Sequence, residues 1–364
     1  MKNKFRISVV LFAAALLSAA FIVSCSKDDD TTPAVDLTAL KASIAAAQTV
    51  YNASVEGKAD GQYPTGSKAA LQAAINAGQT VVDNSATTQA MADNAVVSVN
   101  LAVTTFQGLV NKPIAAENLV AHWSFDEGTG ATAHDASDNH FDGTFKAGPV
   151  GKGWKGAVMP TWGADRTGAA NKAIHFAGGN VEVPYNTKLN PTGAFTMSAW
   201  IKADTIKPGN RFLGLQSWIG YKFEVQEHNV PFFTLGWSET ENPYDRDSGQ
   251  ELPVSEWHQV AVTFTPGHMI FYVDGTKIKE HTDVPNGGRS ISGKPYNLTI
   301  GQDFPTDKYS AGDGTNFGVS SSPDYHVIPL AWGGYFQGSV DELRMYNIVL
   351  SETQIASLYT QEKP

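Results

Sequence analysis

The feature that most constrains the fold is a series of short runs within residues 119–350 in which apolar residues recur at every second position. Residues 195–201, 260–264 and 269–273 each show this period, whereas the region lacks a helical period of useful length. The dipeptide Asp274-Gly275 follows the last run and predicts a two-residue hairpin turn. The pattern therefore predicts an all-β region in which two antiparallel sheets pack face to face.

The end of this region predicts one more strand and then a helix. From Val340 to Tyr346, even-numbered side chains are expected on one face of the strand and odd-numbered ones on the other, because side chains alternate. The period then becomes helical. Ser351 is the expected N-cap, and Ile355 is expected on the buried side of the helix. This helix is expected to close the domain.

Further segments carry a family resemblance: Trp123–Gly128, Asp135–Asn139 with Gly143, Ala173–Gly178, Trp257–His258 leading into Phe271–Gly275, and Asp341–Tyr346. They resemble the laminin G-like, or concanavalin A-like, domains and occur in the family's order. The resemblance implies an antiparallel jelly-roll sandwich over residues 117–361 whose first and last strands lie side by side. The chain is thus expected to be mainly β.

Residues 36–112 have a different composition, rich in Ala, Gln and Asn and poor in aromatics. Apolar residues keep helical spacing in three stretches, which predicts a small all-α three-helix bundle. Tyr63-Pro64 followed by Lys68–Ala77 resembles the FIVAR-type module of bacterial surface proteins. The resemblance implies a spacer that holds the next domain off a membrane. The alternative is a protein or glycan contact made by the module itself.

The N-terminus has the pattern of an export signal. Three basic residues precede an apolar stretch at residues 7–23, and the only cysteine of the chain, Cys25, follows it. Ile22–Cys25 resembles a bacterial lipobox, which implies a signal peptide at residues 1–24, acylation of Cys25 and an acidic tether at residues 25–35. The protein is then expected on the bacterial outer membrane, lipid-anchored and at the cell surface. The alternatives are an uncleaved anchor helix or an ordinary secretory signal.

The charge balance limits the partners. Removal of residues 1–24 takes away three of the 26 basic residues and none of the 36 acidic ones, so the net charge changes from −10 to −13. Nucleic acid is not an expected partner, because its binding needs clustered positive charge. Neutral partners fit better.

The fold does not decide between binding and catalysis, because jelly rolls include lectin-like modules, hydrolases and lyases. Retaining glucanases of this fold carry Glu-x-Asp-x-Glu on one strand, and this sequence lacks that motif. Glu224 and Glu227 are three apart, which would put them on opposite faces of a strand. The sequence therefore favours a protein that is not an enzyme. A hydrolase or lyase with carboxylates from several strands is the alternative.

Ligand contacts are expected from aromatic residues in loops, because sugars present flat C–H faces to aromatic rings and hydroxyl groups to polar side chains. The alternative is that these loops fold back and use their rings as small additional cores. The candidate ligand-binding residues are Trp154, Trp162, Trp237, Tyr244, Arg246, Tyr325 and Trp332.

The family resemblance also implies a structural calcium ion. It would be held by Asp341 and by backbone carbonyls, including one from the turn that contains Gly178, since Ca²⁺ accepts mixed oxygen ligands. The sequence departs from the family here, because Ala177 stands where the turn usually has an aspartate. The alternative is that Asp341 accepts hydrogen bonds from backbone amides or from Arg344.

Together these features predict a membrane-tethered surface lipoprotein that binds extracellular polysaccharide without catalysis. The alternative is an adhesion module that binds a protein, such as a partner in an outer-membrane complex.

Overall fold

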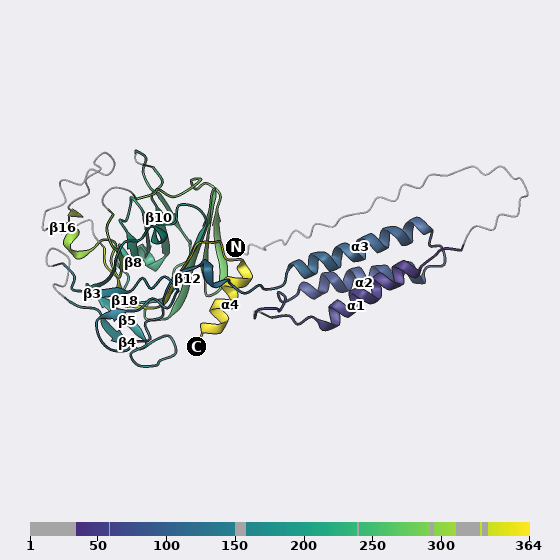
Figure 1. Ribbon diagram of the computed structural model, residues 1–364, viewed down its shortest axis with the longest axis horizontal. Coiled ribbons are helices and arrows are strands. Elements are labelled where there is room, and N and C mark those ends of the chain that lie inside the picture. The colour runs from purple at the N-terminus through teal and green to yellow at the C-terminus, as the bar shows by residue number, and fades with distance from the viewer. Residues whose placement is uncertain are drawn as a thin grey trace, which may run out of the picture.

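The structure is a computed structural model that describes residues 34–57, 59–149, 158–238, 240–291, 295–310, 328–329 and 334–364. An elongated helical bundle is followed by a β-sandwich (Figure 1). The N-terminal signal and most of the tether lie outside the described residues.

The bundle consists of α1 (Thr38–Ala53), α2 (Ser67–Asp83) and α3 (Gln89–Gly108). Leu71 and Phe106 are buried in its core, where the ring of Phe106 stacks on that of Tyr63 at 4.1 Å. This confirms the three helices that the apolar spacing predicted.

The sandwich consists of two eight-stranded sheets. The first sheet contains, in spatial order, β14 (Thr276–His281), β13 (His268–Val273), β12 (His258–Thr265), β7 (Phe195–Ala203), β18 (Gln337–Tyr346), β5 (Ala173–Ala177) and β4 (Thr161–Gly163), and β1 (Leu119–Trp123) also pairs with β18. The second sheet contains β11 (Tyr244–Asp247), β10 (Pro231–Leu235), β9 (Tyr221–Val225), β8 (Asn210–Leu215), β15 (Leu298–Ile300), β6 (Asn180–Val183), β3 (Gly143–Lys146) and β2 (Thr132–Ala133).

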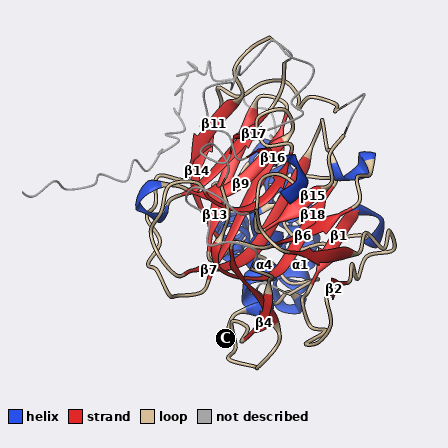
Figure 2. Cartoon of the chain, turned by 90° about the vertical axis from the view of Figure 1, so that its left-hand side faces the viewer, coloured by secondary structure: helices blue, strands red, loops and turns tan. Residues whose placement is uncertain are grey.

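Short elements complete the domain. They are the 3-10 helices η1 (Ala116–Asn118), η2 (Thr187–Leu189), η3 (Glu227–Asn229) and η4 (Thr306–Lys308), the parallel pair β16 (Tyr309–Ser310) and β17 (Ile328–Pro329), and the C-terminal helix α4 (Glu352–Glu362). Figure 2 shows the sandwich from the side away from the bundle, with β11 and β14 near the same edge. The two-sheet, mainly β fold is the one that the alternating runs predicted.

Alternation explains which residues form the core. The apolar positions of the predicted runs in β7, β12 and β13 all point between the sheets. Asp274 and Gly275 have φ angles of 49° and 72°, as a hairpin turn between β13 and β14 requires. The first and last strands, β1 and β18, are antiparallel neighbours, as expected.

The alternation predicted for β18 was wrong, because a β-bulge shifts its register between Asp341 and Arg344. Glu342 adopts φ 51° within the bulge. Val340 and Leu343 therefore both face the core, and the two acidic residues between them both face outward. The bulge gathers charged side chains on one side of the strand.

Helix α4 covers the outer face of the first sheet. Ser351 and Gln354 form a capping box, which confirms the predicted N-cap, and Ile355 is 1% exposed. Ile114 of the interdomain linker packs in the same apolar cluster, and Gln354 Nε2 donates to the Lys112 carbonyl at 3.1 Å. The bundle therefore leaves the sandwich on the α4 side (Figure 1).

In the part of the chain that the structure describes, no helix has both the length and the apolar character needed to cross a membrane.

Candidate functional site

The second sheet turns a polar face away from the core. On β9, Tyr221, Phe223 and Val225 point inward, so Lys222 and Glu224 point outward. The same alternation in the neighbouring strands produces a row that runs in register from β11 to β3. We call this surface the outer face; its row consists of Asp245, Thr234, Lys222, Gly214, Thr299, Glu182 and Thr144.

Two cations and two carboxylates pair with one another at the centre of the outer face. Arg211 Nε donates to Glu224 Oε2 at 3.0 Å, and Arg211 Nη1 pairs with Asp303. Lys222 Nζ pairs with the other oxygen of Glu224. Both carboxylate side chains are 0% exposed. We call these four residues the charge quartet, and their formal charges cancel.

Burial and pairing set the ionisation of the quartet. Burial alone would raise the pKa of Glu224, but Lys222 and Arg211 together lower it below its usual value. Burial lowers the pKa of Lys222, against the pull of Glu224. Glu224 is therefore ionised at neutral pH and is poorly suited to donate a proton to a leaving group.

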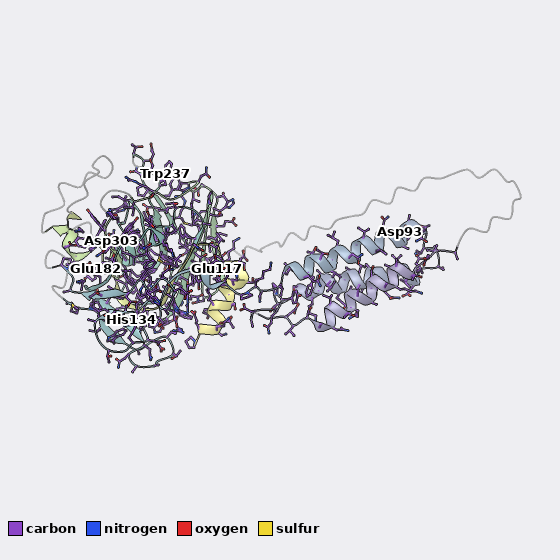
Figure 3. The ribbon with its side chains drawn as sticks, viewed as in Figure 1. Asp93, Glu117, His134, Glu182, Trp237 and Asp303 are labelled. Carbon is purple, nitrogen blue, oxygen red and sulfur yellow. The ribbon has the colours of Figure 1, made fainter. Side chains whose placement is uncertain are left out.

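Aromatic rings surround the quartet. The indole of Trp218 lies 5.1 Å from the Arg211 guanidinium, and the ring of Phe232 lies 5.2 Å from Lys222 Nζ. Tyr309 donates its hydroxyl hydrogen to Asp303. Residues 302–309 cover the middle of the outer face, whereas Asp245 and Thr144 at its two ends are exposed. Figure 3 shows Glu182 and Asp303 on the side of the sandwich away from the bundle.

The structure brings three predicted ligand residues together at the β10–β11 hairpin. Trp237 is 37% exposed, and its Nε1 donates to the Asn242 carbonyl at 3.0 Å. Its ring meets Tyr244 edge to face, with centroids 5.8 Å apart. Arg246 stacks on Tyr244 at 4.9 Å and pairs with Asp283 at 2.7 Å. The indole is thus held in place, while Arg246 joins the edges of the two sheets.

The other predicted ligand residues are not part of this group. Trp162 packs against the sandwich core, 5.2 Å from the ring of Phe145, and its Nε1 donates to the Gly130 carbonyl. It acts as an additional core residue, as the alternative interpretation expected. Trp154, Tyr325 and Trp332 lie outside the described residues.

The expected calcium ligands do not lie together. In the antiparallel pairing of β18 with β5, Gln337 lies opposite Ala177. Gly178 is one position past this pair in one direction, and Asp341 is four positions past it in the opposite direction. At about 3.3 Å per residue this separates them by roughly 16 Å, whereas Ca²⁺ ligands lie within about 2.6 Å of the ion. The Gly178 carbonyl accepts from Gln302 Nε2 at 2.8 Å. Asp341 and Gly178 are therefore too far apart to share one ion in this arrangement, and calcium binding elsewhere stays a prediction.

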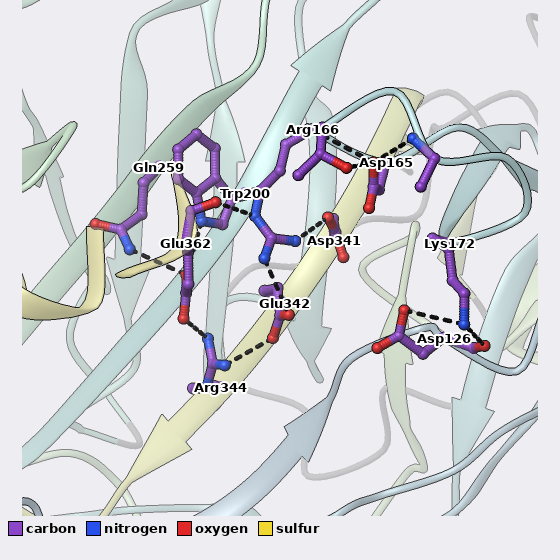
Figure 4. Close-up of polar contacts among 12 residues, drawn as sticks. Asp126, Asp165, Arg166, Lys172, Trp200, Gln259, Asp341, Glu342, Arg344 and Glu362 are labelled. Carbon is purple, nitrogen blue, oxygen red and sulfur yellow. Dashed lines mark hydrogen bonds and ion pairs between the residues drawn. The ribbon is translucent and has the colours of Figure 1, made fainter. Parts of the chain in front are cut away.

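The cation beside Asp341 is a guanidinium group. Arg166 Nη1 donates to Asp341 Oδ2 at 2.5 Å, so the partner is Arg166 rather than Arg344. Arg344 instead bridges Glu342 and Glu362 of α4 (Figure 4). Among the described residues, no group of three or more His, Cys, Asp or Glu side chains is placed to hold a metal ion. The network fastens α4 to the first sheet.

An accessible acid for glycoside cleavage is not evident in these arrangements. Burial raises the pKa of Asp341 to about 7, but this side chain is 1% exposed and lies on the sheet face that α4 covers. Glu224 and Asp303 are both held by Arg211. Neither location offers the open pair of carboxyl groups that glycoside hydrolysis uses.

Sequence reasoning missed the charge quartet. Glu224 was considered only with Glu227, which lies in η3 rather than on β9. The available signal was the alternation of Lys222 and Glu224 with the apolar residues of β9, which predicts an outward polar pair. Asp303 could not be added to that pair from the sequence, because it lies 92 positions from Arg211.

Part of the sandwich is similar to a known family. Residues 176–323 match the laminin G-like family model described as the concanavalin A-like lectin/glucanases superfamily. No curated protein matches the chain.

One solved structure with a similar fold is domain 4 of an extracellular arabinanase from Geobacillus stearothermophilus in complex with arabinotriose. Its sequence is 18% identical, the match covers 66% of this chain and 98% of that chain, and the TM-score is 0.47. Another is the binding domain of Paraclostridial Mosquitocidal Protein 1, with 13% identity, 68% and 52% covered, and a TM-score of 0.44. The binding domain of botulinum neurotoxin DC in complex with SialylT has 12% identity, 68% and 52% covered, and a TM-score of 0.43. The chain spans about half the length of these two toxin structures.

Proposed function

We propose that this protein binds carbohydrate without cleaving it, through the outer face of the second sheet and the Trp237 ring at the edge of that sheet. The superfamily of its sandwich includes lectins and glucanases. Of the two outer sheet faces, the first is covered by α4 and the linker. The second carries the polar row and the aromatic residues; residues 302–309 cover its middle, so a glycan would lie at its β10–β11 end, next to Trp237.

The observation that carries the proposal is that the Trp237 ring is exposed and held in a fixed orientation. Its N–H group is already bonded to the Asn242 carbonyl and its edge contacts Tyr244, so the ring loses little further freedom when a ligand binds. An exposed ring of this kind offers a flat surface to the C–H face of a sugar. Hydroxyl groups of the same sugar can then bond to polar residues of the β10–β11 hairpin.

The absence of catalysis is part of the proposal. Glycoside hydrolysis needs a protonated carboxyl group beside the scissile bond and a second, ionised one across from it. The quartet holds its carboxylates ionised and paired with cations. Such an arrangement binds and orients groups but does not supply the proton.

We also place the protein on a membrane, tethered by acylated Cys25, with the bundle as a spacer. The support is the lipobox-like sequence at the N-terminus and the direction of the bundle. The bundle leaves the sandwich on the side of α4, opposite to the outer face of the second sheet (Figure 1). A tethered molecule would then present its ligand face away from the membrane.

The test uses residues 26–364, which include every described residue. The protein is run by affinity electrophoresis through gels that contain single polysaccharides from a broad panel, and the Trp237→Ala variant is compared on each gel that retards it. We expect retardation by at least one polymer and about 3- to 10-fold weaker binding of the variant, the range expected for loss of one aromatic contact.

Trp257→Ala is the matched control, because this tryptophan precedes β12 of the first sheet and lies under Lys202. It should bind as the wild type does. Retention by no polysaccharide, together with tight binding to a protein partner, would favour the adhesion module instead. Release of reducing ends from a retained polymer would contradict the non-catalytic part of the proposal.

A further inference from the structure

The positively charged groups of the outer face decide which class of glycan it can hold. Acidic sugars carry carboxylate or sulfate groups, and proteins usually bind these through Arg or Lys side chains that are ready to donate to them. The cations at the centre of the outer face are Arg211 and Lys222. Whether Arg211 and Lys222 can donate to an acidic sugar therefore decides the class of glycan.

Both cations are already engaged by carboxylates of the protein. Arg211 pairs with Glu224 and Asp303, and Lys222 pairs with Glu224. These pairs are buried, with Lys222 3% exposed and Glu224 0% exposed. An anionic sugar could use either cation only by displacing a carboxylate that would then be left unpaired in the interior, which is strongly unfavourable.

The rim of the outer face adds negative charge. Asp245 is exposed on β11, and Glu182 is half-buried on β6. Across the described part of this surface, five carboxylates (Glu182, Glu224, Asp245, Asp303, Asp307) face four cations (Lys146, Arg211, Lys222, Lys308). At the hairpin, Arg246 is paired with Asp283. The whole chain has a net charge of −10. An anionic polymer is therefore repelled both locally and at long range.

We infer that the glycan is uncharged, a polymer of neutral sugars held by hydroxyl hydrogen bonds and ring stacking rather than by ion pairs. This inference rests on the proposed function and names the ligand class of the same site. The polar groups near the rim suit it, because Asp245 accepts hydrogen bonds from hydroxyls, as it does from Thr234 Oγ1 at 2.5 Å.

The experiment presents each neutral polysaccharide of the panel beside its own C6-oxidised form, which has the same backbone but carries carboxylates. We expect the neutral form to bind at least about 10-fold more tightly than the oxidised form, because the oxidised form gains repulsion and the buried quartet cations are not available to it. Binding of the neutral form should stay the same between about 50 and 500 mM NaCl, since no ion pair is screened.

Tighter binding of an oxidised or naturally acidic polymer, weakened by NaCl, would overturn the inference and leave the proposed function standing. Retention of no polymer in either form would overturn the proposed function and the inference with it. The two failures are therefore distinguishable in one panel.

Two variants test the electrostatic reason. Asp245→Asn removes one exposed charge and keeps the oxygen that accepts from Thr234, so it should improve binding of the oxidised form about 2-fold. Glu224→Gln removes the carboxylate that pairs with Arg211 and Lys222, so it should improve binding of the oxidised form by more than 2-fold. Glu251→Gln, an exposed change beside His228, is the control and should alter nothing. An unchanged preference in a folded Asp245→Asn protein would contradict the charge argument, whether or not Glu224→Gln folds.

Discussion

Asp341 and Glu342 are neighbouring carboxylates on the same side of β18, yet their surroundings shift their pKa values in opposite directions. Burial raises the pKa of Asp341 to about 7, although Arg166 opposes the shift. Burial would also raise the pKa of Glu342, but His122, Arg344 and Arg166 together lower it to about 2. The two pKa values differ because Asp341 shares the Arg166 guanidinium with Glu342 and with the Glu362 carbonyl. In addition, Asp341 Oδ1 lacks a partner among the described residues.

This arrangement predicts a pH-dependent stability of the sandwich. The folded-state pKa of Asp341 lies above its unfolded value of 3.8, so its contribution to stability is complete below about pH 4 and is lost as the pH rises through 7. Asp341→Asn should remove this decline, which amounts to at most about 4 kcal/mol of unfolding free energy. Urea unfolding from pH 4 to 8 measures it.

Exposed Asp126→Asn is the matched control and should keep the wild-type pH profile. If Asp341→Asn also keeps the wild-type slope, Asp341 is ionised throughout and the Arg166 pair dominates its environment.

At the level of single elements, the β13–β14 hairpin is coupled to α4. A Cβ atom at Gly275 would lie 2.8 Å from Tyr359 Cβ, and Tyr359 stacks on Trp200 at 5.5 Å. Gly275 has φ 72° and Gly168 has φ 86°, but Gly168 has nothing within 4 Å of its Cβ position. Comparing alanine substitutions at the two glycines therefore separates the effect of positive-φ backbone strain from the effect of contact with Tyr359 of α4.

Gly275→Ala should destabilise the sandwich more than Gly168→Ala does. Both variants carry the positive-φ cost of about 1 kcal/mol, and only Gly275→Ala adds about 1 kcal/mol for displacing Tyr359. Thermal unfolding monitored by tryptophan fluorescence measures the difference. Equal losses in the two variants would show that α4 does not pack firmly on the hairpin.

The elements differ in how far the sequence could predict them. β7, β12 and β13 follow from strict alternation, and the hairpin turn follows from Asp274 and Gly275, because each signal is local. The bulge of β18 could not be predicted, since it is a feature of the pairing with β7, and Arg166, the partner of Asp341 in the bulge, lies 175 positions away. Trp237, Tyr244 and Arg246 could be named as candidates because aromatic residues in a polar loop are a local signal, whereas the charge quartet joins separate strands and a loop.

At the scale of the whole molecule, the bundle and the sandwich have separate apolar cores. We expect two unfolding transitions in calorimetry. Leu71→Ala, at a position 1% exposed in the bundle, should lower one transition by about 3 kcal/mol and leave the other unchanged. Leu101→Ala, at a position 65% exposed on α3, is the control and should shift neither. A single transition that moves as a whole in the Leu71 variant would contradict independent folding.

The proposed tether has its own prediction. Cys25→Ala should abolish incorporation of a palmitate analogue in a bacterial host with lipoprotein processing, and it should move the protein from the detergent to the aqueous phase on partitioning. Ser26→Ala is the control and should remain acylated. An unlabelled wild-type protein would refute the anchor without affecting the glycan site.

The most direct test of the central claim is calorimetric titration of residues 26–364 with a retained neutral polysaccharide, followed by measurement of reducing ends in the same sample. The account predicts saturable binding that is about 3- to 10-fold weaker in Trp237→Ala, unchanged in Trp257→Ala, and free of new reducing ends. Equal affinity in Trp237→Ala and the wild type, or accumulation of reducing ends, would contradict it.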